Sequence, residues 1–258
     1  MEIATIVPSN YLHLVKDDYY HLCLAHLIGK DEEYTLFYQD MKCGPDSKFI
    51  IMDNGVAEGE TLDIEEIYYK ASVVMADELV LPDVFLDGPA TVKSSLAALN
   101  LLEEFNYKGR IMAVPQGCDY DEWLRCATTL LKDGRIHTLG IPKNLVKLKG
   151  NLGRLRAIMD LNLIRMIDNV SIHLLGCWTD PREVGMIYRN IRSVSPGVTI
   201  RGVDSGIATI YAQEGLPLIP DKHPKPKRIV DFAGKDLDED LLYQNINIWK
   251  RCCFGELC

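Results

Sequence analysis

Polar residues able to act as acids, bases or nucleophiles recur directly after short apolar runs along this chain. Asp53 follows FIIM, Asp83 follows LVLP, Gln116 follows MAVP and Asp204 follows TIRGV. Any one of them alone is typical of a turn or a helix cap. Together they indicate one shared site, because the carboxyl ends of parallel strands meet at the same rim of a barrel.

Two carboxylates facing one pocket suit retaining glycosyl transfer. One attacks the anomeric carbon, and the other handles the proton of the departing and arriving groups. The carboxylates alone do not select a sugar polymer over a nucleoside. Asp83 and Gln116 add groups that suit the edge of a base, since a carboxylate accepts from N–H groups while an amide both donates and accepts. This combination favours a purine.

Short β-branched runs alternate with helical patterns from end to end, as in βαβ units. The sequence predicts strands at 3–7, 49–52, 79–81, 111–114, 138–141, 171–175 and 199–203. It predicts helices at 64–74, 91–105 and 123–131, one starting at Asp180, and a last one at 238–251. An eighth strand is expected at Pro217–Ile219 or at Ile229–Phe232.

This pattern predicts a single (β/α)8 TIM-type barrel domain over residues 1–258, with a C-terminal helical extension from about residue 235. Such barrels commonly occupy about 250 residues. A doubly wound open sheet is the alternative. No GxGxxG follows the first strand, and the strand count fits a closed barrel better.

Composition places the chain among globular proteins, with 47% hydrophobic and 25% charged residues and a net charge of −9. No apolar run approaches the ~20 residues that cross a bilayer, and the first residues lack a signal-peptide pattern. We therefore expect a cytoplasmic protein with no membrane partner. Its eight cysteines suit reduced thiols better than a disulfide framework.

One segment stands out as basic within this acidic chain. No acidic residue lies between Asp133 and Asp160. The basic residues there that should lie at the catalytic rim are Lys143, Lys147, Lys149, Arg154 and Arg156. A charge run is often only a solvated face. Beside a pocket, it predicts contacts to nucleic-acid phosphates.

The strand-end residues also form a set of motifs. Asp53, Asn54 and Gly55 stand at the end of one strand, and Asp83 ends the next. The remaining motif residues are Gln116 and Gly117, Gly140, the segment Leu174, Leu175 and Gly176, and Asp204 in GVDSG. From about residue 49 to residue 211, the chain resembles the tRNA-guanine transglycosylase superfamily. It is most similar to the short phage-type members that place 7-deazaguanines into DNA.

The resemblance implies a pentosyltransferase with Asp204 as the nucleophile and Asp53 as the general acid/base. It also implies a set of residues around the purine: Asp83, Gln116, Gly117, Gly140, Gly176 and Asn54, with Leu175 packing on the base. The family's aromatic residue after the first motif is replaced here by Val56 and Ala57. We therefore expect stacking from Phe85.

The resemblance implies DNA and a 7-deazaguanine base as substrates, and a host-cell cytoplasm for a phage protein. The tRNA enzymes follow their nucleophile with a Thr-Arg segment, whereas this chain reads SGIATIYA. A compact tRNA-guanine transglycosylase is one alternative. A non-catalytic nucleic-acid-binding partner subunit is another. A homodimer is a further expectation.

The family's zinc site is not expected here. Its cysteine cluster needs a downstream histidine, whereas Cys252, Cys253 and Cys258 lie at the end of this chain, after the last histidine, His223. We predict no metal and no cofactor. A metal held with His223 from upstream stays open as the alternative.

Overall fold

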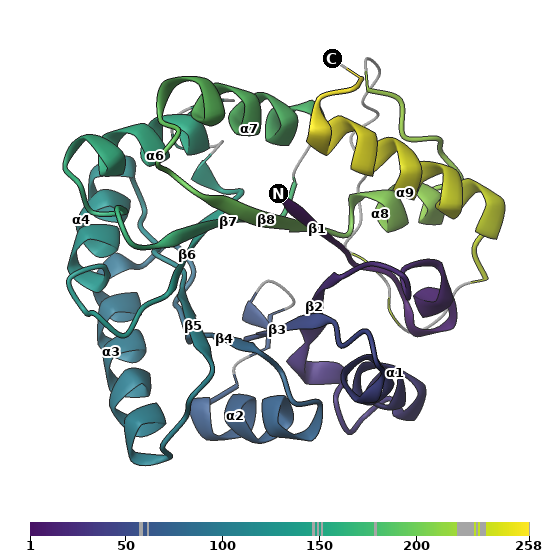
Figure 1. The fold of residues 1–258 in the computed structure, drawn as a ribbon, viewed down its shortest axis with the longest axis horizontal. Helices are drawn as coiled ribbons and strands as arrows, with labels where there is room; N and C mark the ends of the chain where they lie inside the picture. Colours follow the sequence, from purple (N-terminus) through teal and green to yellow (C-terminus); the bar gives the residue numbers. More distant parts are fainter. Residues whose placement is uncertain are drawn as a thin grey trace.

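The fold is an eight-stranded parallel sheet curved into a barrel and surrounded by helices (Figure 1). The computed structural model describes residues 1–56, 59–60, 62–145, 148, 150, 152–177, 180–220, 230, 232 and 236–257. The strands are β1 Glu2–Thr5, β2 Tyr20–Leu24, β3 Phe49–Asp53, β4 Glu78–Val80, β5 Arg110–Ala113, β6 Thr138–Pro142, β7 Ser171–Leu175 and β8 Ile200–Ser205.

The hydrogen-bonded strand order is β1-β8-β7-β6-β5-β4-β3-β2. The two strands at its ends, β1 and β2, lie side by side, so the barrel is nearly closed (Figure 1). The predicted (β/α)8 barrel is therefore confirmed. Every carboxyl end points to the same rim, since all the paired strands are parallel.

Helices alternate with these strands. They are α1 Glu32–Cys43, α2 Ile64–Val73, α3 Gly88–Glu104, α4 Tyr120–Leu130, α6 Gly153–Leu163, α7 Arg182–Val194, α8 Ile207–Gln213 and α9 Glu239–Phe254. Short 3₁₀ helices at Ser9–Leu14 and Ala25–Leu27 follow β1 and β2. No described helix is long and apolar enough to span a membrane.

Aspartate side chains start many of these helices. Asp31, Asp63, Asp87, Asp119 and Asp238 each accept a hydrogen bond from a backbone N–H in the first turn of α1, α2, α3, α4 and α9. Such caps satisfy donors that the helix itself leaves unpaired. These caps therefore fix the residues at which the five helices begin.

One strand was placed wrongly. Sequence patterns put the eighth strand near the C-terminus, but Pro217–Ile219 forms no strand of the sheet, and neither do Val230 and Phe232, while Ile229 lies outside the described residues. The missing strand is β2, and all five of its residues are buried. The strand begins with Tyr20 and His21, so its continuous apolar run is only Leu22–Leu24, and the strand pattern is weak in the sequence.

The last helix, α9, completes the helical layer. It packs against α7, α8 and β1, and Trp249 and Ile246 on its inner face are buried. Figure 1 shows α9 beside α8 at the barrel wall rather than projecting from it. The helix predicted at 238–251 is thus part of the barrel wall.

Candidate active site

The four polar residues predicted at strand ends all lie buried at the carboxyl rim of the barrel. Asp53 is the last residue of β3, Asp83 follows β4, Gln116 follows β5, and Asp204 lies one residue before the end of β8. Burying carboxylates is costly unless other groups compensate for the lost water. Their surroundings supply that compensation.

Asp83 is held by two amide side chains. Asn54 Nδ2 donates to Asp83 Oδ1 over 2.6 Å, and Gln116 Nε2 donates to Asp83 Oδ2 over 2.5 Å. Burial raises the pKa of the Asp83 carboxyl to about 6, while the hydrogen bonds from Asn54 and Gln116 oppose that rise. The carboxyl is therefore mostly ionised at neutral pH and can accept further N–H groups.

Asn144, just beyond β6, joins this cluster. Gln116 turns its amide nitrogen to Asp83, so its Oε1 faces Asn144 and accepts a hydrogen bond from Asn144 Nδ2 over 3.2 Å. Asn144 Oδ1 is buried and has no hydrogen-bond partner among the described residues. A buried acceptor left unpaired is costly, which suggests that a ligand donor satisfies it. The sequence motifs had not indicated Asn144.

The surroundings of Asp53 favour the protonated form of its carboxyl group. Burial raises the pKa of its carboxyl to about 7; the Gly55 N–H bond lowers the pKa, while the negative charges of Asp204 and Asp83 raise it further. Gly55 N donates to Asp53 Oδ2 over 3.1 Å. A carboxyl with a pKa near 7 can both give and take a proton at neutral pH.

Among the described residues, Asp204 is hydrogen-bonded through its Oδ1. Its Oδ1 lies 2.9 Å from His173 Nε2 and accepts from Gly176 N over 3.3 Å. Within the described part of the chain, no donor is bonded to Oδ2. His173, in the middle of β7, was not foreseen. Its only sequence signal is a histidine inside an otherwise apolar strand.

The glycines expected around the base occupy crowded positions. A Cβ at Gly117 would lie 2.4 Å from the backbone nitrogen of Trp123 in α4. A Cβ at Gly140 would lie 2.7 Å from Leu175 Cδ1, so Gly140 and Leu175 adjoin on neighbouring strands. Gly176 has a positive φ of 67°, which favours glycine. That conformation turns its N–H toward Asp204.

Phe85 lies in the loop after β4, two residues beyond Asp83. Its side chain is 61% exposed, and the neighbouring Val84 and Leu86 are exposed as well. Leu86 has a φ of 59°, which is unusual for a side chain of this type. The loop therefore presents apolar side chains to solvent beside the polar cluster, and stacking by Phe85 stays a prediction.

The basic segment does not lie wholly on the protein surface. Arg154 is 0% exposed: it pairs with Glu183 of α7 through Nε at 3.0 Å and Nη2 at 2.6 Å, and Nη1 donates to the Gly176 carbonyl over 2.8 Å. The expectation that Arg154 contacts phosphates is wrong, because this guanidinium is buried in an ion pair. It instead fixes the turn at Gly176.

The other basic residues are placed differently. Arg156 is exposed, 3.4 Å from Asp160, with its guanidinium over the Tyr120 ring. Lys143 is half-buried, and its chain lies under Gly176. Lys147 and Lys149 lie outside the described residues. A contact between this segment and phosphates stays a prediction for Lys143, Lys147, Lys149 and Arg156.

Two of the three cysteines near the end of the chain are buried in the protein. Cys252 and Cys253 are buried on α9, while Cys258 and His223 lie outside the described residues. No group of three or more candidate metal ligands gathers among the described His, Cys, Asp and Glu residues.

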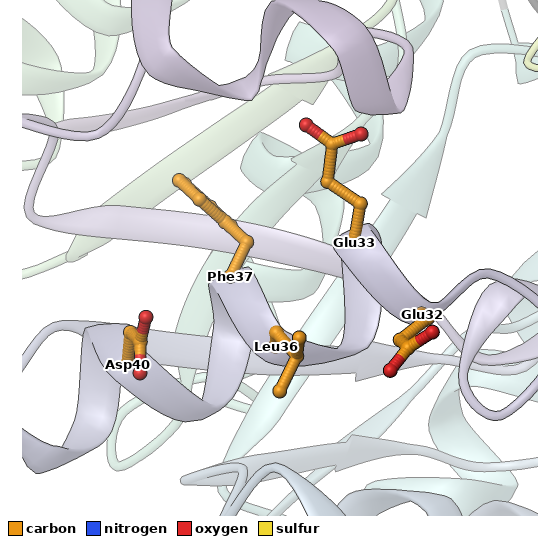
Figure 2. A pocket seen from close by; sticks show the side chains of 5 residues that line it. All are labelled: Glu32, Glu33, Leu36, Phe37 and Asp40. Atoms are coloured by element: carbon orange, nitrogen blue, oxygen red, sulfur yellow. The ribbon is translucent and has the colours of Figure 1, made fainter.

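A surface hollow along α1 is separate from this site (Figure 2). Its lining comprises Glu32, Glu33, Leu36, Phe37 and Asp40. None of the strand-end residues lines it.

Comparison with known proteins identifies the class of fold. D-psicose 3-epimerase with D-tagatose from Clostridium cellulolyticum H10 matches with a TM-score of 0.54 and 7% identity, over 98% of this chain and 98% of that chain. D-psicose 3-epimerase in the presence of D-fructose matches with a TM-score of 0.52 and 9% identity, over 99% of this chain and 100% of that chain.

A third solved structure is β-methylaspartase from Clostridium tetanomorphum, with a TM-score of 0.51 and 14% identity. That match covers 97% of this chain and 57% of the longer enzyme. At such identities the likeness shows the (β/α)8-barrel fold alone. No family model and no curated protein matches the sequence.

Proposed function

We propose that this protein is a base-exchange transglycosylase that replaces guanine in DNA with a 7-deazaguanine through a covalent aspartyl intermediate. The observation that carries the proposal is the pairing of two different carboxyls at one rim. Asp53 has a pKa raised to about 7, and Asp204 is fixed through Oδ1, while no described residue donates to its Oδ2. A proton donor and a nucleophile are what retaining exchange requires.

In the first step, Asp204 attacks the anomeric carbon of the target nucleotide. A bond forms between the carboxylate oxygen and C1′, and the bond between C1′ and N9 of guanine breaks. The electron pair of that bond goes to guanine, which takes a proton from Asp53. The raised pKa of Asp53 supports this role, because the group still holds a proton near neutral pH.

In the second step, the new base enters and restores the glycosidic bond. Asp53, now ionised, takes the proton from N9 of the incoming 7-deazaguanine, and this nitrogen attacks C1′. The bond between C1′ and Asp204 breaks, and the carboxylate is regenerated. Two displacements retain the configuration at C1′, as base replacement in DNA requires.

Base selection falls to the cluster of Asp83, Gln116 and Asn144. Its acceptors for a base are the remaining lone pairs of Asp83 and the Oδ1 of Asn144, which has no partner in the part of the chain that the structure describes. A guanine edge carries N–H donors that match such acceptors. A site built this way rejects bases that lack those donors, because its buried acceptors then stay unpaired.

The polymer must be presented with its target nucleotide out of the stack, since C1′ is shielded inside a duplex. The exposed loop at Phe85 and the cations Lys143 and Arg156 flank the rim. DNA is preferred over tRNA because the segment after Asp204 lacks the tRNA enzymes' Thr-Arg pattern.

The test measures incorporation of labelled guanine by purified protein into duplex DNA, single-stranded DNA and tRNA. We expect incorporation into DNA, and none by Asp204→Asn. Incorporation into tRNA alone would identify the compact tRNA enzyme instead. If both polymers bind and neither exchanges a base, the protein is a non-catalytic binding subunit and the proposal fails.

A further inference from the structure

A chain of hydrogen bonds crosses the interior of the barrel and ends on Asp204. From Asp204 Oδ1 it passes to His173 Nε2 at 2.9 Å, and from His173 Nδ1 to the Tyr20 hydroxyl at 2.8 Å. Arg201 Nε then donates to that hydroxyl over 3.0 Å. Tyr20 and Asp204 are buried, and His173 is fully buried.

The far end of this chain is anchored by a second buried acid. Arg201 pairs with Glu78, which is fully buried, and its Nη1 donates to Thr138 Oγ1 over 3.0 Å. Tyr20 fits beside β8 because residue 202 is a glycine: a Cβ there would lie 2.6 Å from the Tyr20 ring. The ring of Tyr20, which belongs to β2, therefore lies against β8, a strand far from β2 in the sequence.

The donors fix the direction of every hydrogen bond in this chain. A guanidinium only donates, so the Tyr20 oxygen accepts from Arg201. Burial holds the pKa of Tyr20 far above its usual range, so the phenol keeps its proton. Among the described residues, His173 Nδ1 is the acceptor for that proton. With Nδ1 as the acceptor, the ring hydrogen of His173 lies on Nε2, and this N–H points at Asp204.

This arrangement separates the two oxygens of Asp204. Oδ1 accepts from His173 and from Gly176, whereas Oδ2 has no donor in the described part of the chain. A fixed carboxylate with one occupied oxygen meets a substrate with the other. Holding a reacting group in position in this way contributes strongly to rate, since a displacement of about 1 Å can cost about 100-fold.

We propose that Tyr20 and His173 are positioning residues that orient Asp204 so that its Oδ2 attacks the anomeric carbon. The inference rests on the proposed function, in which Asp204 is the nucleophile. A contribution to protein stability alone does not explain this chain of hydrogen bonds well. Replacing buried charged groups with apolar residues of similar size is often neutral or stabilising, yet this barrel encloses Arg201, Glu78, Tyr20 and His173.

A first experiment needs no activity. Nitrogen NMR of histidine-labelled protein reads the tautomer of His173, with the signals assigned by their loss in His173→Gln. We expect Nδ1 unprotonated and Nε2 protonated, and a mixture of tautomers in Tyr20→Phe. A proton on Nδ1 in the wild type, or an unchanged His173 signal in Tyr20→Phe, would overturn the proposed chain.

A second experiment measures the single-turnover rate of the covalent adduct with a guanine-containing DNA oligonucleotide. We expect His173→Leu and Tyr20→Phe to slow adduct formation about 100-fold and about 10-fold, with DNA affinity unchanged. His173→Gln should recover most of the rate, because its amide can still donate to Oδ1. His13→Leu, at an exposed histidine, is the matched control.

The outcomes separate the two proposals. If the wild type forms the adduct and folded His173→Leu forms it equally fast, the positioning role is wrong while the proposed function stands. If His173→Leu does not fold, Tyr20→Phe, which keeps the ring, decides in its place. If the wild type forms no adduct, the proposed function is wrong. The attacking role of Oδ2 is then wrong as well, whatever the NMR result.

Discussion

Gln116 Nε2 donates to Asp83 Oδ2 over 2.5 Å, so two side chains from neighbouring strand ends act as one unit. The carboxylate orients the amide of Gln116, and the amide in turn orients Asn144. A change at any one of the three residues therefore alters the hydrogen-bonding pattern of the others. In the proposed function, we expect base selection to depend on this coupling.

The first prediction concerns Asp83 in the hydrogen-bonded cluster of Asp83, Gln116 and Asn144. Asp83→Asn presents an amide to Gln116, which must turn its own amide or lose its bond. We expect guanine exchange to fall at least about 100-fold, because buried polar groups lose their partners. DNA binding should change less than about threefold. The measurement compares labelled-guanine exchange with DNA affinity, and Asp168→Asn in the exposed turn between α6 and β7 is the control.

A parallel loss of DNA affinity in Asp83→Asn would show that the cluster supports the DNA surface rather than the base. Unchanged exchange would remove Asp83 from base recognition.

The second prediction concerns the unpaired oxygen of Asn144. Asn144→Leu removes an acceptor that has no partner among the described residues of the free protein. We expect the free energy of unfolding to change by less than about 1 kcal/mol, because one unsatisfied group is removed while Gln116 loses a donor. The KM for the incoming base should rise at least about 10-fold.

Thermal melting and exchange kinetics measure these two effects in Asn144→Leu. Asn190→Leu, on the exposed face of α7, is the matched control. A strongly destabilised Asn144→Leu with an unchanged KM would assign Asn144 a purely structural role.

The third prediction follows from the raised pKa of Asp53. Departure of guanine needs Asp53 protonated, and its pKa is about 7. The single-turnover rate of adduct formation should therefore be constant below about pH 6 and fall about tenfold per pH unit above about pH 8. Rates measured from pH 5 to 9 test this. A rate that does not fall at high pH would exclude Asp53 as the acid.

The pH dependence of protein stability gives an independent test of the raised pKa of Asp53. The pKa of Asp53 in the folded protein lies above its ordinary value of 3.8. Protonated Asp53 therefore makes its full contribution to the stability of the folded protein below about pH 4, and this contribution is lost as pH rises through 7. Asp53→Asn should gain stability relative to the wild type over that range, by at most about 1.4 kcal/mol per unit of pKa shift. Denaturant unfolding at pH 4 and pH 8 measures it.

Local patterns were enough to locate the strand ends. Asp53, Asp83, Gln116 and Asp204 each follow a short apolar run, and the parallel sheet brings such positions to one rim. Once seven strands had been recognised, the barrel followed from their alternation with helices. Nothing in these steps needed knowledge of long-range contacts.

Residues that act through distant partners could not be found in this way. His173 contacts Tyr20, which lies 153 positions away in the sequence. The strand that carries Tyr20 was not recognised, because it begins with Tyr20 and His21 and its apolar run is short. Arg154 looked like a surface cation beside other basic residues. Its partner Glu183 comes from the next helix, which sequence spacing does not reveal.

The fourth prediction tests the buried pair of Arg154 and Glu183. Arg154→Met leaves the Glu183 carboxylate without its partner, and removing one member of a buried ion pair costs about 3–5 kcal/mol. The double variant Arg154→Met with Glu183→Gln should recover part of that loss. Urea unfolding of the two variants measures this. Equal stability of Arg154→Met and the wild type would contradict the structural role.

The last prediction separates phosphate contacts from structural cations within the basic segment. Each lysine that neutralises a DNA phosphate contributes about 0.9 to the slope of log affinity against log salt concentration. Lys147→Gln with Lys149→Gln should therefore lower the magnitude of the slope by about 1 to 2, and weaken binding to all DNA sequences alike. Arg125→Gln with Arg165→Gln, outside the segment, is a control of equal charge change. Loss of the same slope in both double variants would mean that total charge, rather than the segment of Lys147 and Lys149, governs DNA binding. A loss confined to the variant of Lys147 and Lys149 would support contacts between this segment and the DNA backbone.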